Sequence, residues 1–207
     1  MSTIKTLIFD FGDVFINLDK PAIDRELLKL GIPKTMSLDM DYVASEYEKG
    51  LISNDTFIKY FTDKFKHISK SDLIKAWNAI ILDFPEHRLK FIEQIRKDDE
   101  YHLILLSNTN NYHIEQVIKN MSSSRYKRFK NCFHKFYLSQ EIHLSKPSTA
   151  IYEFVLNEND LNPDECIFIN DLKENTDAAS KLGIHTWNLI PGKEEVINLF
   201  TINKHLF

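Results

Sequence analysis

The 207-residue sequence predicts an α/β fold, in which a parallel sheet is flanked by helices and carries an all-helical insert. Short, nearly continuous apolar runs are typical of strands that are covered on both faces. Helical patterns lie between most of these runs, which favours βαβ units. The interval from residue 20 to 84 contains helical patterns only. With 43% hydrophobic and 12% aromatic residues, the chain has the composition of a folded protein.

The apolar runs predict five strands in chain order: Ile4–Phe9, His102–Leu106, Lys135–Leu138, Cys166–Ile169 and Ile184–Leu189. Each is bounded by polar or turn-forming residues, and each has the length of an ordinary strand.

Four helices are expected between and before the later strands. The first begins at Pro85, a residue favoured in the first turn, and carries Leu89, Ile92 and Ile95 at helical spacing. The others cover residues 110–121, 147–156 and 172–182, and the last of them ends at Gly183.

The helical insert contains four further patterns, at residues 21–30, 37–49, 54–65 and 71–82. Gly31 and Gly50 follow the first two, where glycine commonly ends a helix. We therefore predict a core domain formed by residues 1–18 and 85–207 and a helical cap domain formed by residues 19–84.

Composition argues against several partners and locations. The formal charge of −4 gives no net attraction to nucleic acid or to anionic lipid. A basic cluster of Arg125, Lys127, Arg128 and Lys130 is interpreted as a solvated face, although its interleaved aromatics could also contact single-stranded nucleic acid. Two cysteines without metal spacing, no signal peptide and no apolar span predict a cytoplasmic location without a membrane partner. The oligomeric state is unknown.

Polar residues follow the predicted strands where, in a parallel sheet, ligands bind. Asp10 follows the first strand, and Ser107 with Asn108 follows the second. Lys146 comes after a longer loop, and Asn170 with Asp171 follows the fourth strand. Each of these residues alone is common in turns and loops. Together they provide a carboxylate nucleophile, a hydroxyl donor, a cation and a second carboxylate.

This combination suits phosphoryl transfer. A phosphomonoester repels an anionic nucleophile, so the site must first offset charge, and Mg²⁺ bound by Asp10 and Asp171 would do so. Lys146 and Ser107 would hold the other phosphate oxygens as charge builds up.

Four segments carry a family resemblance: "IFDFGDVF", "LILLSNTN", "LSKPSTAIYEFVL" and "IFINDLKENTDAASKLGI". In this order they resemble the four motifs of the haloacid dehalogenase (HAD) superfamily, and the insert resembles its small helical cap. Within the superfamily the chain is most similar to the phosphatases of sugar phosphates such as glucose 1-phosphate, which share "LSNTN" and "YLSQ".

The resemblance implies a Rossmann-like core and a magnesium-dependent phosphatase that acts on a small phosphorylated metabolite. An aspartyl-phosphate would form on Asp10 and then be hydrolysed by water. Magnesium would be held by Asp10, the backbone carbonyl of Gly12 and Asp171. Ser107, Asn108 and Lys146 would bind the substrate phosphate.

The sequence departs from the family at two positions. Most phosphatases of the superfamily carry a second Asp, the acid–base residue, where this chain has Gly12, although its most similar group also has Gly there. The neighbouring Asp13 is a candidate replacement, or else a turn residue. Asn170 stands where many relatives have an acidic residue, and its amide could still contact magnesium.

These departures leave two alternatives open. The chain could be a catalytically weakened relative that binds a phosphorylated ligand or a partner in a regulatory role. It could also be a metal-independent 2-haloacid dehalogenase, which Asp171 and the "FGDV" sequence oppose. Specificity rests on the shape of the cap surface, so the motifs do not identify the physiological substrate.

Overall fold

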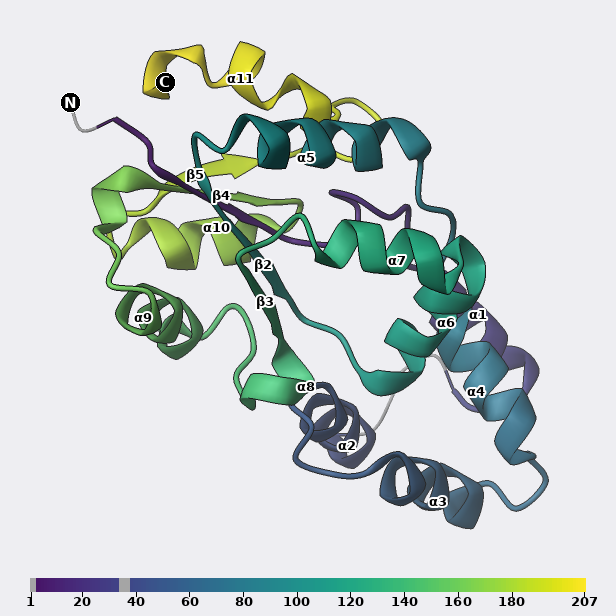
Figure 1. The fold of residues 1–207 in the computed structure, drawn as a ribbon. Helices are drawn as coiled ribbons and strands as arrows, with labels where there is room; N and C mark the ends of the chain where they lie inside the picture. The colour runs from purple at the N-terminus through teal and green to yellow at the C-terminus, as the bar shows by residue number, and fades with distance from the viewer. Residues whose placement is uncertain (1–2, 34–37) are drawn as a thin grey trace.

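The computed structural model describes residues 3–33 and 38–207 and contains a five-stranded parallel sheet (Figure 1). The strand order is β3-β2-β1-β4-β5. The strands are β1 Thr6–Phe9, β2 His102–Ser107, β3 Lys135–Leu138, β4 Cys166–Asn170 and β5 His185–Asn188. All five predicted strands and the predicted α/β fold class are confirmed, with ends that differ by at most two residues.

The sheet is buried on both faces, as its apolar strands predict. In the central strand β1, Leu7 and Phe9 point into one hydrophobic cluster, whereas Ile8 points into a second cluster that includes Ile104 and Phe168. This alternation is the period of two that a pleated strand imposes. The sheet is therefore the middle layer of three.

Helices cover both faces. The first cluster is completed by α5 Glu86–Asp98, α6 Asn111–Met121, α7 Ser123–Lys130 and α11 Leu199–Ile202. The second is completed by α9 Thr149–Glu158 and α10 Lys173–Ser180. Figure 1 shows α5 and α11 together on one side of the sheet and α9 on the other. The remaining short elements are α8 Ser139–Ile142, η1 Pro163–Glu165, η2 Val196–Asn198 and η3 Lys204–Leu206.

Helix α7 contains the basic cluster. Arg125 pairs with Glu86 at 2.8 Å, and Arg128 pairs with Glu93 at 2.9 Å. Phe129, between the basic residues, is fully buried in the first cluster. The arginines thus lie on an ion-paired, solvated helix face while the aromatic ring serves the core, in agreement with the solvated interpretation.

The inserted segment forms helices α1 Ala22–Lys29, α2 Leu38–Glu48, α3 Asn54–Lys64 and α4 Lys70–Asn78. Ser53 and Ser69 cap α3 and α4, since each hydroxyl accepts a hydrogen bond from a backbone N–H three residues later. The predicted start of the second helix, Ser37, lies outside the described residues. The division into core and cap stays a prediction.

The last helix of the insert ends four residues earlier than predicted. Ile81, inside the predicted helix, instead forms an antiparallel bridge with Leu18. Backbone hydrogen bonds between Asn17 and both Leu82 and Asp83 extend this pairing. The chain therefore enters and leaves the insert along two adjacent extended segments.

Helix α6 belongs to two hydrophobic clusters. Its first turn places Tyr112 in the cluster formed by the insert, whereas Val117 and Met121 lie in the first cluster of the sheet. His113 is buried, and its Nε2 donates to the backbone oxygen of Trp77 on α4 at 3.1 Å. Helix α6 thus connects the insert to the sheet through its packing.

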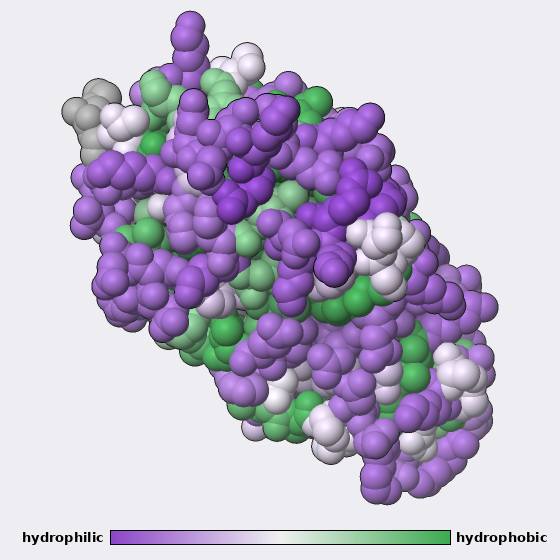
Figure 2. All heavy atoms as spheres, in the orientation of Figure 1, coloured by the Kyte–Doolittle hydropathy of each residue, from purple (hydrophilic) through white to green (hydrophobic). Residues whose placement is uncertain are grey.

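The molecular surface in the view of Figure 2 is mostly hydrophilic, and apolar side chains form small separate areas on it. Within the described ranges, none of the helices combines the length and the apolar character needed to cross a lipid bilayer.

Candidate active site

The predicted site residues lie at the carboxyl edge of the sheet. Phe9, the last residue of β1, pairs with Leu105 of β2 and with Ile169 of β4. Asp10 continues this register, because its backbone N–H donates to the oxygen of Ile169 at 2.9 Å. The residues that follow the three central strands are therefore neighbours, as the strand-end argument predicts.

Asp10 has hydrogen-bond donors on both carboxylate oxygens and is 7% exposed. Its Oδ1 lies 2.8 Å from Lys146 Nζ and accepts the Phe11 N–H at 2.7 Å. Its Oδ2 accepts from the Asn170 side-chain amide. These contacts fix the carboxylate plane, so the side chain is oriented before any ligand arrives.

Lys146 is buried, with a side chain that is 1% exposed. Its Nζ also donates to the backbone oxygen of Leu106 at 2.9 Å. Asn108 fixes the lysine backbone through two reciprocal hydrogen bonds of 2.9 Å, one to the N–H and one from its amide to the carbonyl. The role of Asn108 is thus at least partly to position Lys146 beside Asp10.

Ser107 is buried at the end of β2, and it is one of the residues that line a small cavity of about 100 Å³. The hydroxyl lies 3.4 Å from the backbone oxygen of Asn108, which is long for an O–H···O hydrogen bond. The phosphate contact of Ser107 stays a prediction.

Asp171 is the second predicted magnesium ligand, and its side chain is 4% exposed. Burial and the neighbouring charge of Asp10 raise the pKa of this carboxyl, against the effect of Lys20. Lys20 Nζ pairs with Asp171 and, at 3.0 Å, with Asp13. Burial lowers the pKa of Lys20, but the hydrogen bonds to the two carboxylates outweigh this and raise it.

Asp13 has a left-handed backbone conformation with φ of 54°. Its Oδ1 accepts the Leu18 N–H at 3.0 Å, and its other oxygen pairs with Lys20. Both carboxylate oxygens therefore hold the loop that follows β1. The acid–base role of Asp13 stays a prediction, beside the turn role that these contacts describe.

Asn170 is fully buried, and both ends of its amide are engaged. Its Oδ1 accepts from the Leu172 N–H at 2.9 Å and from the Asn175 amide at 3.0 Å. Its nitrogen donates to Asp10. Asn170 thus orients Asp10, and its predicted magnesium contact would require one of these bonds to open.

An open cavity of about 330 Å³ joins these groups. Asp10, Gly12, Lys20, Glu48, Asn108, Lys146 and Asp171 are among its lining residues. The two carboxylates Asp10 and Asp171 provide the oxygen donors that Mg²⁺ takes, together with waters and substrate phosphate. Within residues 3–33 and 38–207, no cluster of three or more Asp, Glu, His or Cys side chains could hold a metal ion. The protein ligands of the metal would therefore be the side chains of this pair.

The donor set therefore fits magnesium. The charge repulsion that raises the pKa of Asp171 is what a divalent cation between the two carboxylates would relieve. The Lys20 ammonium group partly provides that compensation in the structure.

A family model described as haloacid dehalogenase-like hydrolase matches residues 7–189. The chain belongs to this family. The prediction made from the four motifs is therefore confirmed, and the match extends over the insert as well as the sheet.

Among curated proteins of known activity, this member of the family is similar to the D-ribitol-5-phosphate phosphatase of Bacteroides thetaiotaomicron. The two are 29% identical over 189 residues, which cover 89% of this chain and 91% of the relative.

Solved structures of a HAD family enzyme from the same organism are also similar. One is 32% identical with a TM-score of 0.86 and covers 96% of this chain and 99% of its own. A wild-type complex with magnesium and inorganic phosphate is 31% identical with a TM-score of 0.79, and covers 92% and 96% of the two chains. The Rossmann-like core predicted for the family is confirmed.

The structure explains how this HAD family member accommodates Gly12. A Cβ atom at this position would lie 2.7 Å from Cδ1 of Leu18, which is closer than real Cβ contacts. Any side chain at position 12 would therefore require the flexible end of Leu18 to move.

Two charged side chains at the cavity come from the insert: Glu48 lies in the segment "EYEKG", residues 46–50, which the sequence offers as a candidate ligand contact, whereas Lys20 has no role assigned from the sequence. Lys20 and Glu48 both come from the inserted segment and line the larger cavity. No local motif marks Lys20, because it reaches the site through tertiary packing. The segment that contains Glu48 includes Gly50, which follows the helix that ends at Glu48.

Proposed function

We propose that this HAD family member is a magnesium-dependent phosphatase that hydrolyses a small phosphorylated metabolite through an aspartyl-phosphate on Asp10. The observation that supports the proposal most directly is the buried pair of Asp10 and Lys146, 2.8 Å apart, at the wall of an open cavity. A carboxylate held by an ammonium group can attack phosphorus without the phosphate being repelled.

Each side chain has a defined task in this proposal. Asp10 supplies the attacking oxygen, and its contacts to Phe11 N–H and Asn170 keep it oriented. Lys146 balances charge on the phosphoryl oxygens, and Ser107 donates to one of them. Bound by Asp10, Asp171 and the Gly12 carbonyl, magnesium would supply further positive charge and orient the phosphate.

The substrate class follows from the cavity and from the relatives. The main cavity continues into the smaller one, with which it shares Gly12, Leu18, Glu48, Ile80 and Asn108. A phosphate at Asp10 would leave room for a leaving group of a few carbons. Since the similar curated protein is named a D-ribitol-5-phosphate phosphatase, phosphorylated polyols and sugars are the class to test first.

The proposal extends to the organisation of the chain. Residues 1–18 and 85–207 would form the catalytic core, and residues 19–84 would form a cap that limits access of water and leaving groups. A cytoplasmic location, suggested by two free, buried cysteines, belongs to the same proposal.

The test is release of inorganic phosphate from a panel of phosphorylated polyols and sugars with Mg²⁺. We expect turnover of at least one substrate and a loss of more than about a thousandfold in Asp10→Asn, since the nucleophile is then an amide. Asp41→Asn, an exposed carboxylate on α2, is the matched control and should keep parent activity. Phosphate release that persists in Asp10→Asn would refute the assignment.

A second candidate function is phosphorylated-ligand binding without turnover. It is favoured by Gly12 together with the filling of its side-chain space by Leu18. Binding of a panel compound by the parent, with no phosphate release from any of them, would support it. Release of halide from a 2-haloacid by the same protein without added metal would support the dehalogenase alternative.

A further inference from the structure

Glu48 brings a carboxyl group from the inserted segment to the active site. It is the last residue of α2, is partly buried, and lines both the larger and the smaller cavity. The larger cavity contains Asp10 and Lys146, and the smaller one contains Ser107. Glu48 is thus at the boundary between the space for the phosphoryl group and the space for the leaving group.

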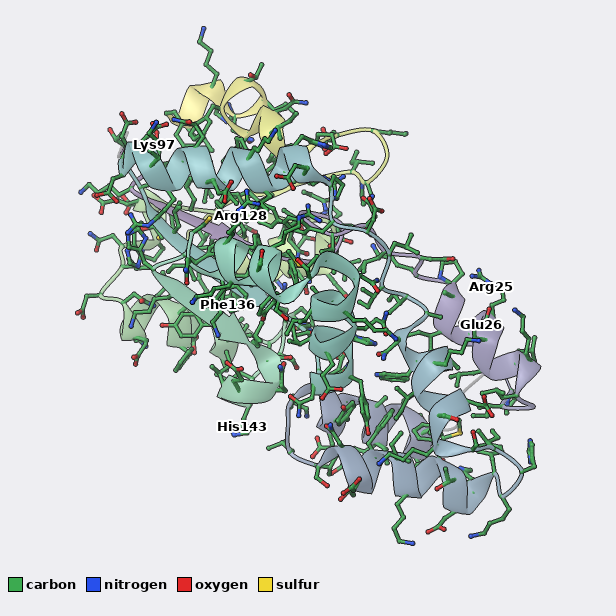
Figure 3. All side chains as sticks on the ribbon, turned by 45° about the vertical axis from the view of Figure 1, so that its right-hand side comes forward. Arg25, Glu26, Lys97, Arg128, Phe136 and His143 are labelled. Carbon is green, nitrogen blue, oxygen red and sulfur yellow. The ribbon has the colours of Figure 1, made fainter. Side chains whose placement is uncertain are left out.

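The backbone around Glu48 is fixed to the core. The Ser139 hydroxyl lies 2.7 Å from the backbone oxygen of Glu48, and it also accepts the Thr109 N–H at 2.9 Å. His143 Nδ1 donates to the oxygen of Lys49 at 2.8 Å. Figure 3 shows His143 at the end of α8, on the side of the core near the insert.

Gly50 makes this contact possible. Its φ is 64°, and a Cβ atom there would lie 2.1 Å from the backbone oxygen of Gln140. Only glycine allows so close an approach of the two backbones. The same Ser139 that holds Glu48 also holds the loop after β2, so the position of Glu48 is tied to that of Ser107 and Asn108.

The charged groups facing this carboxyl suit a proton donor. Burial raises the pKa of Glu48 to about 7, while Lys146 acts to lower it. Asp10, Asp171 and Lys20 line the same cavity. His113, in the smaller cavity, has a pKa lowered to about 4 by burial and is neutral at pH 7.

The usual position for the acid carries no carboxyl group in this chain. Gly12 has no side chain, and Leu18 fills the space next to it. Asp13, the alternative from the sequence, uses both oxygens in the loop and in the Lys20 pair. Among the carboxylates that line the larger cavity, Asp10 is the nucleophile and Asp171 the metal ligand of the proposed function.

We propose that Glu48 is the general acid and base of the reaction, provided by the inserted segment in place of the residue missing at position 12. This inference rests on the proposed phosphatase function. As an Asp10 oxygen bonds to phosphorus, the bond from phosphorus to the leaving oxygen breaks, and that oxygen takes the proton of Glu48. Glu48, now a carboxylate, accepts a proton from water whose oxygen attacks phosphorus, which breaks the bond to Asp10 and releases inorganic phosphate.

The test compares two leaving groups in Glu48→Gln. Loss of a general acid or base costs about 10²- to 10⁴-fold in rate. D-Ribitol 5-phosphate leaves as an alkoxide and needs the proton, whereas 4-nitrophenyl phosphate leaves as a stabilised phenolate. For Glu48→Gln we expect single-turnover cleavage of the ribitol ester to fall at least about a hundredfold, and that of the nitrophenyl ester less than about fivefold.

Two further measurements separate catalysis from structure. The nitrophenyl ester should give a burst of one phenolate per enzyme in Glu48→Gln, because the aspartyl-phosphate is then hydrolysed slowly. The fall in parent kcat/KM for the ribitol ester as pH rises through about 7 should disappear in this variant. Phosphate affinity near pH 6 should stay close to that of the parent, and so should thermal stability near pH 4, where Glu48 is protonated in both the folded and the unfolded protein. Asp41→Asn should leave both quantities unchanged.

The outcomes are distinct. If the parent hydrolyses neither ester, the proposed function fails. If the parent is active and Glu48→Gln keeps its rate on the ribitol ester, or loses both esters equally in the first turnover, only the role of Glu48 fails. A leaving-group dependence that appears in Asp13→Asn and not in Glu48→Gln would assign the role to Asp13.

Discussion

Replacing Lys146 by methionine should cost both stability and activity. Lys146 is buried and pairs with Asp10, so the substitution leaves a buried carboxylate without its cation. Breaking one side of a buried ion pair typically costs about 3–5 kcal/mol. For a chain of about 200 residues each kcal/mol lowers the Tm by about 2–4 °C, which predicts a decrease of about 6–20 °C.

A double-mutant cycle tests this origin. Asp10→Asn alone leaves Lys146 as the unpaired buried charge, whereas the double variant removes both charges. We therefore expect the double variant to be less destabilised than the sum of the single variants by at least about 2 kcal/mol, measured by urea unfolding. Lys90→Met, an exposed lysine on α5, is the control and should change the free energy of unfolding by less than about 0.5 kcal/mol.

Additivity within about 0.5 kcal/mol would refute the reasoning, because it would mean that the two side chains do not stabilise one another. In the activity assay, Lys146→Met should also lower kcat by about 10²- to 10³-fold, the usual effect of removing a group that stabilises developing charge. If Lys146→Met has a lower Tm but keeps the parent kcat at low temperature, the ion pair contributes to stability and not to catalysis.

Four further predictions follow from the cavity. Lys20→Met should tighten Mg²⁺ binding up to about fivefold by calorimetry, because the half-exposed Lys20 ammonium group, in an ion pair of at most about 1 kcal/mol, no longer competes for Asp171. Weaker binding would contradict this. Gly12→Asp should destabilise the protein by at most about 3 kcal/mol, because the flexible Leu18 side chain must move, and adding Leu18→Ala should relieve that cost. In Glu48→Gln, adding Gly12→Asp together with Leu18→Ala should raise turnover of the ribitol ester at least about tenfold. Chelation of Mg²⁺ should stop phosphate release and added Mg²⁺ restore it, whereas release in excess chelator would exclude a required metal. The pKa of Glu48 is raised to about 7 in the folded protein, so its contribution to stability is fully present below pH 4.5 and is lost as pH rises through 7. Glu48→Gln should therefore be more stable than the parent between pH 5 and 8, by at most about 3 kcal/mol. A gain in stability confined to acid pH would contradict the assignment.

The strand-end residues could be predicted because their positions depend on local patterns. Asp10, Ser107 and Asn170 each follow an apolar run, and the parallel pairing of β1 with β2 and β4 places such residues side by side. Lys146 was also predicted, although the Asn108 hydrogen bonds that position it connect residues 38 positions apart. Local periodicity carries no information about such pairs.

The positions of the two cavity residues from the insert depend on how the insert packs against the core, which the sequence does not show. Glu48 reaches the cavity because Gly50 lies against Gln140, and Lys20 reaches Asp171 across 151 positions of the chain. The early end of α4 has the same kind of cause, since Ile81 pairs with Leu18 in place of continuing the helix. Tertiary contacts override local propensity at each of these places.

Helix α6 has a consequence for protein engineering. Because Tyr112 and His113 are buried against the insert while the same helix packs on the sheet, the insert is not an interchangeable cassette. A chimera that receives residues 19–84 from a relative without this tryptophan would keep the His113 ring and lose the Trp77 ring on which it stacks. Successful exchange of specificity between relatives therefore requires the first turn of α6 to be transplanted with the insert.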